Sequence, residues 1–399
     1  MAAEAYDYVV CGGGTSGCVI AGRLAEDLNV SVCVIEAGPD NADLDNVHMV
    51  GGWSQNFDGP TDWNITSEPA PGINGRQVKN SRGRFLGGCS GLNGTLCIRG
   101  NKQDYDDWGL DGWTGEDMWK CMARSELSRH GIQTQVDLQG VGKNLMDHAI
   151  TFVFYETNEP KLTNDHLAYY DGALASSYQL YKDTKTGFLS AFPFGAFGYG
   201  RLDDRLKDLP EWQQASPPAD PHVTKPHGPA ENRDAMGLLP SAQPNVEWFS
   251  TECYGGPKQY ADFPSNGQGA FAMISMLLSP RSRGSVTLAS ADPTTNPVVD
   301  HNYLADPLDV LVMAEACRWG NEIVTKGAGT KDYIKGSWPP SEKHHEYTTR
   351  EEWADFARKN ATTSQMPAYG IGEKAAELIR EDAKRAPDAR RNDSAVASI

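Results

Sequence analysis

The hydrophobic positions of the first forty residues follow two different periods. Residues 8–10 and 30–35 are short, almost continuous apolar runs, which predict buried strands. Between the two runs, residues 18–27 repeat small and apolar side chains at helical spacing, with Ile20, Ala21, Leu24 and Ala25 able to face a sheet. The order strand, helix, strand predicts a βαβ unit at the start of the chain.

The second half of the chain has fewer clear periods. The strand-like runs 271–278 and 285–288 flank residues 280–284, which predicts a hairpin. Residues 309–324 and 351–359 predict helices, the first with an apolar side. The stretch 188–199 mixes aromatic with small residues, and we expect these aromatic side chains to fill a core, since aromatic side chains usually do.

Three glycines interrupt the predicted βαβ unit at a defined spacing. Gly12, Gly14 and Gly17 fit G-x-G-x-x-G, in which one glycine permits a tight turn, one lets backbone approach a pyrophosphate, and one lets helix and strand pack closely. Glu36 ends the second strand about twenty residues later, where an acid accepts ribose hydroxyls. Glycine clusters also form ordinary turns, but the whole unit occurs in order here. The unit alone does not separate FAD from NAD.

A second glycine-rich segment spans residues 82–100. Its glycines, with Ser, Thr and Asn between them, suit a loop whose backbone amides wrap a flat or phosphorylated ligand. Composition alone fits a surface turn equally well.

Several of these motifs together resemble the glucose-methanol-choline (GMC) oxidoreductase family, in particular its fungal choline dehydrogenase-like and formate oxidase-like members. The motifs are GGGTSG at 12–17, Glu36-Ala37-Gly38, and the segments 62–64, 83–100, 104–108, 280–286 and 302–304. The resemblance implies an α/β protein with a Rossmann-like, three-layer ββα domain that binds FAD, and a second α+β domain with an antiparallel sheet that binds substrate. We expect residues 1–149 plus 360–380 to form the FAD domain, 150–359 the substrate domain, and 381–399 a disordered tail.

The resemblance also implies which residues contact the cofactor FAD. They lie in both glycine-rich segments, after the second strand and at the start of the family's final helix: Gly12, Gly14, Thr15, Ser16, Gly17, Glu36, Ala37, Gly38, Arg84, Gly87, Gly88, Ser90, Asn93, Gly94, Thr95, Leu96, Gln365 and Met366. Cys89 and Cys97 depart from the family's usual residues, and neither should block backbone contacts.

Two family segments are missing from this chain, which resembles a GMC protein with internal deletions. One gap follows Glu126, and the other follows Ser364, where the family carries its catalytic histidine. The implied reaction is oxidation of a small-molecule alcohol by hydride transfer to flavin, with oxygen or another acceptor reoxidising the flavin. Because the histidine segment is missing, we name no catalytic residue. The alternative is a catalytically impaired FAD-binding or scaffold homologue.

The remaining histidines offer weak substitutes for the missing one. His344 and His345 lie nearest the second gap, but we expect them to be solvated surface residues. His148 resembles a structural family residue, and His301 suits a surface or turn role. No clustered Cys/His set or His-Glu-x-x-His motif predicts a metal site, and no G-x-S-x-G motif follows a strand.

The composition of the chain limits the classes of partner that we expect it to bind. Lys and Arg number 36 against 53 Asp and Glu, and a net charge of -17 repels nucleic acid. No apolar run approaches the ~20 residues of a membrane span. Residues 1–6 are too short for a signal peptide and lack its positive charge, so we expect an intracellular, cytoplasmic protein. Eight cysteines form no C-x-x-C pair, and we expect several to be buried thiols.

Overall fold

The computed structural model divides the chain into two units. It describes residues 5–49, 52, 55–93, 143, 145–159, 162–190, 194–214, 244–252, 267–292 and 295–363. The first unit comprises residues 1–65, 81–141 and 365–399, and the second comprises 66–80 and 142–364. Residues 66–80 therefore join the second unit instead of the first. The assignment of cofactor and substrate to the two units stays a prediction, and the expected tail at 381–399 lies outside the described residues.

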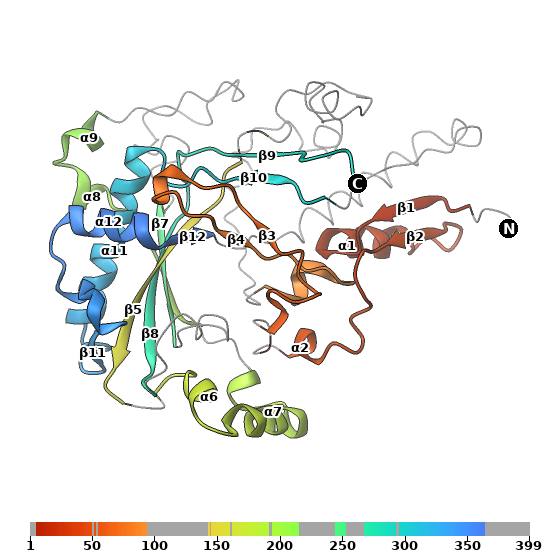
Figure 1. Ribbon diagram of the computed structural model, residues 1–399, viewed down its shortest axis with the longest axis horizontal. Helices are drawn as coiled ribbons and strands as arrows, with labels where there is room; N and C mark the ends of the chain where they lie inside the picture. The colour runs from red at the N-terminus through yellow and green to blue at the C-terminus, as the bar shows by residue number, and fades with distance from the viewer. Residues whose placement is uncertain are drawn as a thin grey trace. The chain divides into compact units, whose positions relative to one another are not determined.

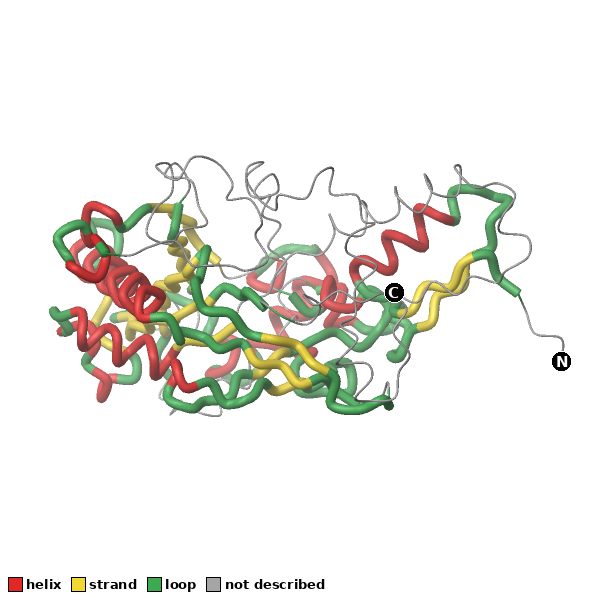
Figure 2. The backbone as a smooth tube through the Cα atoms, turned by 90° about the horizontal axis from the view of Figure 1, so that it is seen from above, coloured by secondary structure: helices red, strands yellow, loops and turns green. Residues whose placement is uncertain are grey.

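The first unit contains the predicted βαβ arrangement. Strands β1 (Tyr8–Cys11) and β2 (Val32–Ile35) pair in parallel, with Val10 opposite Val34, and helix α1 (Thr15–Leu24) connects them. Val10 packs against Ile20 and Leu24 of α1 because side chains alternate between the faces of a strand. Figure 2 shows α1 lying along the strand pair. The unit also contains α2 (Asp45–His48) and the 3-10 helix η3 (Gly88–Gly91).

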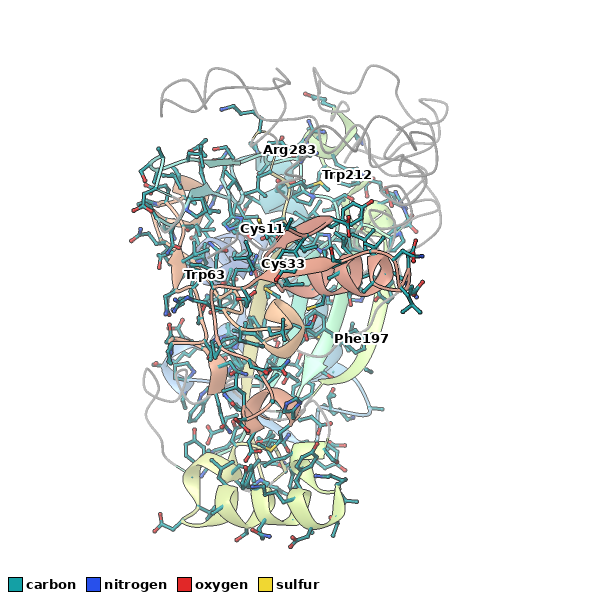
Figure 3. All side chains as sticks on the ribbon, turned by 90° about the vertical axis from the view of Figure 1, so that its right-hand side faces the viewer. Cys11, Cys33, Trp63, Phe197, Trp212 and Arg283 are labelled. Carbon is teal, nitrogen blue, oxygen red and sulfur yellow. The ribbon has the colours of Figure 1, made fainter. Side chains whose placement is uncertain are left out.

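The cysteines of the first unit are less buried than expected. Figure 3 labels Cys11 on β1 and Cys33 on β2. Cys11 and Cys18 are exposed and Cys33 is half-buried, whereas Cys317 of the second unit is fully buried. The expectation that thiols in strands are buried was therefore wrong for Cys11, since an apolar run does not show which face of a strand is covered.

The second unit is built on a six-stranded antiparallel sheet, as the family resemblance implies (Figure 1). The strand order is β11-β5-β8-β7-β6, and β12 also pairs with β5. The strands are β5 (Ala149–Thr157), β6 (Phe194–Gly200), β7 (Val246–Thr251), β8 (Ala270–Leu277), β11 (Ile334–Ser337) and β12 (Ala361–Thr363). Two small sheets accompany it: β3 (Ile65–Thr66) with β4 (Lys79–Asn80), and β9 (Ser285–Thr287) with β10 (Val298–Asp300).

Two helices cover the sheet and stabilise it. Helix α11 (Pro307–Lys326) begins at Asp306, whose carboxylate accepts the Leu308 N–H, and α12 (Arg350–Asn360) begins with a capping box. Both predicted helices are therefore confirmed, with ends shifted by a few residues. The Trp248 indole of β7 donates to the Ala316 carbonyl of α11 at 2.9 Å, which fixes helix to sheet. Shorter helices are η2 (Pro71–Ile73), α6 (His166–Tyr169), α7 (Ala173–Thr184), η5 (Phe188–Ser190), α8 (Asp203–Leu206), α9 (Pro210–Gln213), η7 (Pro340–Glu342) and η8 (His344–Glu346).

The predicted hairpin at residues 280–284 was wrong. Strand β9 pairs with β10 and not with β8. The Asp309 carboxylate accepts the backbone N–H groups of Arg281 and Ser282 at 2.7 and 2.8 Å, and Arg281 pairs with Asp306 at 2.9 Å. The segment is thus held by the first turn of α11, an interaction between distant residues that a local pattern does not contain.

The aromatic stretch 188–199 also differs from its prediction. Phe188, Phe197 and Tyr199 are 48%, 37% and 50% exposed, so they do not fill a core. Strand β6 lies at the edge of the sheet, where one side of the strand has no neighbouring strand in the described structure.

A fully buried carboxylate joins three elements of the second unit. Glu315 of α11 has no exposed area, and its oxygens lie 2.6 Å from Arg205 of α8, 2.6 Å from Arg350 of α12 and 2.9 Å from Arg318. Partial exposure of the arginines lowers the cost of dehydrating them, while Glu315 depends on them fully. The network therefore fixes α8 and α12 to α11.

We expect Glu315→Gln to lower the free energy of unfolding by about 3 kcal/mol, because it leaves closely packed arginines without their anion. Urea unfolding measures the loss. Glu322→Gln is the matched control: Glu322 is 29% exposed and its pairs with Arg205 and Arg318 span 3.1 and 3.6 Å, so its loss should stay below about 1 kcal/mol. Equal losses of unfolding free energy in the two variants would show that Glu315 does not hold the three helices together.

Candidate functional site

The first glycine turn connects β1 to α1 and is tightly constrained by its own backbone. Gly12 has φ +95°, a conformation that favours glycine, and its N–H donates to the Ile35 carbonyl at 2.7 Å. A Cβ on Gly17 would overlap the carbonyl oxygen of Gly12. The packing of α1 against β1 and β2 is therefore enough to explain why residues 12 and 17 are glycine.

Gly14 is different, because nothing in the described protein requires a glycine there. It precedes α1 with φ -78° and ψ -168°, which any residue adopts, and a Cβ on it would meet no heavy atom of the described residues within 4 Å. The open space lies at the start of a ten-residue helix, where free N–H groups and the helix dipole favour an anion. A phosphate group fits this position in charge and in space.

The second glycine segment lies directly against this turn. The Gly87 N–H donates to the Gly13 carbonyl at 2.7 Å, and a Cβ on Gly88 would come within 2.8 Å of the Gly14 Cα. The hydroxyls of Thr15 and Ser90 are 2.7 Å apart. Two segments separated by seventy residues therefore form one surface of backbone and small side chains.

The Glu36 carboxylate holds the turn after β2. Its Oε2 accepts the Gly13 N–H at 2.7 Å and its Oε1 accepts the Gly38 N–H at 2.9 Å. Each carboxylate oxygen has a second lone pair, so Glu36 can still accept a ribose hydroxyl. The sequence did not predict that the acid also positions the glycine turn.

Arg84 has a structural partner of its own. Its guanidinium lies 5.4 Å from the ring centroid of Trp63, and the backbone N–H of Arg84 donates to the Thr61 carbonyl at 2.8 Å. Close by, the buried Asp62 accepts the N–H groups of Asn64 and Arg82, each at 3.0 Å. Asp62 and Trp63 carried the family resemblance, and the structure shows that they shape the loop before the second glycine segment.

Three asparagines that sequence reasoning missed support the second segment. Asn41 donates to the Leu86 carbonyl at 2.7 Å, on one side of the Gly87–Ser90 turn. On the other side Asn56, which is fully buried, donates to the Gly91 carbonyl at 3.2 Å and accepts from Asn46 at 2.6 Å. The only sequence signal was asparagine within a loop, which carries no information on partners.

The structure thus brings together most of the described residues of the predicted FAD site. Gly12 to Gly17, Glu36 to Gly38 and Gly87 to Ser90 are joined by the contacts above. Asn93 follows η3 and donates its backbone N–H to the Cys89 carbonyl at 3.0 Å. Gly94, Thr95, Leu96, Gln365 and Met366 lie outside the described residues. Binding of FAD by these residues stays a prediction.

The described histidines have structural roles. His344 is 1% exposed, so the expectation of a solvated surface residue was wrong for it, and its ring contacts Tyr155 and Phe356. His301 is 7% exposed, stacks on Tyr303 at 4.7 Å and hydrogen bonds Asn80 at 2.8 Å, so a surface role was also wrong. Among the described residues no group of three His, Cys, Asp or Glu side chains is placed to hold a metal, and no helix there is long and apolar enough to cross a membrane.

The first unit therefore has the βαβ fold and the bare glycine turn of a dinucleotide-binding protein. The chain belongs to the GMC oxidoreductase family, whose models match residues 6–151 and 280–370. These ranges contain both glycine segments and helix α11.

Individual relatives match shorter parts of the chain. It is 41% identical over 129 residues to the chloroplastic fatty acid photodecarboxylase of Chlamydomonas reinhardtii, which covers 32% of this chain and 21% of that protein. It is 30% identical over 236 residues to the mitochondrial choline dehydrogenase of Mus musculus, covering 57% and 37%. The matches thus span about a fifth to two fifths of these relatives' lengths.

The fold of one solved structure matches a larger part of this chain than the sequence matches do. A variant of formate oxidase from Aspergillus oryzae superposes with a TM-score of 0.79 at 20% identity, over 95% of this chain and 99% of that one. The expected arrangement of a Rossmann-like unit with a second α+β unit is therefore confirmed as the fold.

Protonation of His344 should make the protein sensitive to acid. Its Nε2–H donates to the Phe154 carbonyl at 2.6 Å, its Nδ1 has no hydrogen-bond partner among the described residues, and burial lowers its pKa to about 4. The unfolded chain, with a pKa near 6.5, binds this proton first as pH falls. Stability is therefore lost between about pH 6.5 and 4, by roughly 3 kcal/mol in total.

We expect His344→Gln to flatten the dependence of unfolding free energy on pH in that window, measured by urea unfolding at several pH values. His345→Gln, which replaces a ring that is 31% exposed, should keep the wild-type dependence. A wild-type slope in His344→Gln would show that His344 is not held neutral.

Proposed function

We propose that this chain is an FAD-dependent oxidoreductase that acts on the CH–OH group of a small-molecule alcohol. The single observation that carries the proposal is the empty space at Gly14, at the start of α1 and against the Gly87–Ser90 segment. Two of the three glycines are explained by the fold itself, and a ligand that approaches the backbone would explain the third. Membership of the GMC oxidoreductase family supports FAD as that ligand.

Each part of the site would hold a different part of the cofactor. The N-terminus of α1 and the N–H groups of the first turn would offset the charge of the diphosphate. Glu36 would accept ribose hydroxyls while keeping its bonds to Gly13 and Gly38. The Gly87–Ser90 segment would present backbone to the diphosphate from the opposite side.

When bound, the flavin supplies the hydride acceptor of the reaction. The protein's own task is to bind and orient the alcohol and to take up its hydroxyl proton. Oxygen or another acceptor would then reoxidise the flavin, as the family resemblance implies. Alcohol oxidase from Candida boidinii, 39% identical over 126 residues, supports an alcohol as the donor.

A catalytically impaired FAD-binding homologue is the second candidate. The observation that favours it is the burial of His301 and His344, which are 7% and 1% exposed, because a buried ring does not reach an alcohol that binds from outside. Both candidates require flavin, and they differ in whether an alcohol bleaches it under anaerobic conditions.

We expect the purified wild-type protein to be yellow, with flavin bands close to one per chain, and Gly14→Val to be colourless. The valine side chain meets no described protein atom within 4 Å of its Cβ, so it should block the cofactor and leave the fold intact. Visible absorbance after gel filtration measures the flavin, and circular dichroism checks the fold.

Gly22→Val is the matched control. Gly22 lies in the same helix and is exposed, and a Cβ there also meets no atom within 4 Å. This variant should keep the wild-type flavin content. Equal flavin in Gly14→Val and wild type, or a colourless wild type that binds NAD tightly, would overturn the proposal.

A further inference from the structure

Helix α7 differs from the other long helices of the second unit in what it buries. It has twelve residues and none of them is buried, whereas α11 buries residues along its whole length and α12 buries Trp353, Phe356 and Ala357. No side chain caps the N-terminus of α7. An isolated helix of about a dozen residues is marginally stable in water, and most helices in proteins are stabilised by the packing of an apolar face. The apolar face of α7 is therefore available to a partner.

Residues on either side of α7 are buried, although the helix is not. Asp165, just before α6, is fully buried and accepts the Ala270 N–H of β8 at 2.7 Å and the Thr163 hydroxyl at 2.8 Å. After α7, Leu189 of η5 is buried as well. Figures 1 and 3 both show α7 past one end of the sheet of this unit. The segment is thus held in place without burial of the apolar residues of α7.

The exposed apolar side chains of this segment form what we call the α7 patch. Its members are between 38% and 48% exposed: Leu162, Tyr170, Leu174, Leu180 and Phe188. Leu174, Tyr178 and Tyr181 are spaced by four and three residues, so they lie along one side of α7. The ring of Phe188 in η5 packs against that of His166 in α6 at 4.7 Å. Single exposed apolar residues are ordinary, whereas five of them within residues 162–188 are typical of an interaction surface.

The two ends of α7 carry opposite charges. Asp171 is exposed and precedes the helix, while Lys182 and Lys185 lie at its C-terminal end. The two ammonium groups lie 4.8 and 4.9 Å from the centroids of the tyrosine rings one turn earlier, so both lysines lie along the apolar side. Asp183 lies on the other side of the helix, where Gln179 donates to it at 2.8 Å. The apolar side of α7 is therefore complementary in charge to a reversed copy of itself.

We propose that the α7 patch is the interface of a homodimer, in which α7 packs antiparallel on the α7 of a second copy of this chain. A two-fold axis near Tyr178 brings Asp171 opposite Lys185 of the partner subunit. The same axis brings Leu174 opposite Lys182 of the partner subunit, whose methylene stem covers apolar surface while its charge reaches water. Antiparallel packing also sets each positive helix N-terminus beside a negative C-terminus.

A lipid surface suits this patch less well than a second copy does. Helices that lie on membranes typically carry Lys and Arg along their polar side, whereas the polar side of α7 carries Gln179 and Asp183. The net charge of -17 also opposes contact with anionic lipid. The interface contains none of the residues of the candidate FAD site, so its test is independent of the proposed function.

Sedimentation of the full-length chain at physiological ionic strength tests the dimer, because salt then screens the repulsion between two acidic chains. We expect the wild-type mass to reach twice the 43.5 kDa of one chain and to fall on dilution. Leu174→Glu should raise the dissociation constant by about 100-fold or more, because it buries unpaired charge in the interface. The variant should keep the wild-type circular dichroism, since an acid in the first turn suits a helix.

Leu28→Glu is the matched control for Leu174→Glu. Leu28 is 96% exposed and lies in the loop after α1, outside the α7 patch. This variant makes the same chemical change and should dimerise as the wild type does. Equal weakening by the two substitutions would overturn the proposal.

Exchange of the two end charges tests the antiparallel arrangement. We expect Asp171→Lys and Lys185→Glu each to raise the dissociation constant by about 10-fold, because each sets like charges opposite one another twice in the dimer. The double variant Asp171→Lys/Lys185→Glu restores opposite charges and should return to within about threefold of the wild-type value. Additive weakening in the double variant would overturn the antiparallel pairing.

Two further results would also overturn the proposal. The first is a wild-type mass of one chain at every concentration up to about 100 μM. The second is a monomer that sediments with phosphatidylcholine vesicles and loses this property in Leu174→Glu, which would assign the α7 patch to a lipid surface instead.

Discussion

The contact between two glycine turns organises the first unit. The Gly87 N–H bonds to the Gly13 carbonyl, and Gly88 lies so close to Gly14 that a side chain on Gly88 would collide with it. Backbone can meet backbone in this way only where side chains are missing. The contact leaves an open strip at Gly14, bounded by the start of α1 on one side and by the second segment on the other. Glu36 and the asparagines 41, 46 and 56 hold both turns from outside the strip.

The second unit is stabilised by an apolar core and by ion pairs at the edge of that core. Its sheet and α11 bury a large apolar core, while the charges at the edge of that core are paired, as with Glu315 and its three arginines. Asp309 is held in another way, because it is fully buried and accepts the backbone N–H groups of Arg281 and Ser282. The second unit therefore satisfies its buried carboxylates with cations in one place and with backbone donors in another.

Sequence patterns correctly predicted those elements whose formation depends on neighbouring residues. The βαβ unit and the helices 309–324 and 351–359 were correct because their apolar periods and caps lie within a few residues of one another. The hairpin at 280–284 was wrong because Asp309, about twenty-five residues away, holds that segment. The predicted core at 188–199 was wrong because the sequence does not show that β6 is an edge strand.

The residues of the candidate site also fall into a group that the sequence predicted and a group that it did not. The glycine spacing and Glu36 predicted the first turn, and the family resemblance predicted the segment 87–90 that lies against it. Asn41 and Asn56 were missed because they donate to backbone carbonyls, which every residue possesses, and Asn46 was missed because it acts through the side chain of Asn56.

Hydrogen–deuterium exchange with and without FAD tests most directly whether the two glycine turns form one cofactor site. A cofactor held between them slows amide exchange in residues 12–18 and in residues 86–91 at the same time, with saturation at the same FAD concentration. Protection of only one of these segments, or of neither, would contradict a shared site.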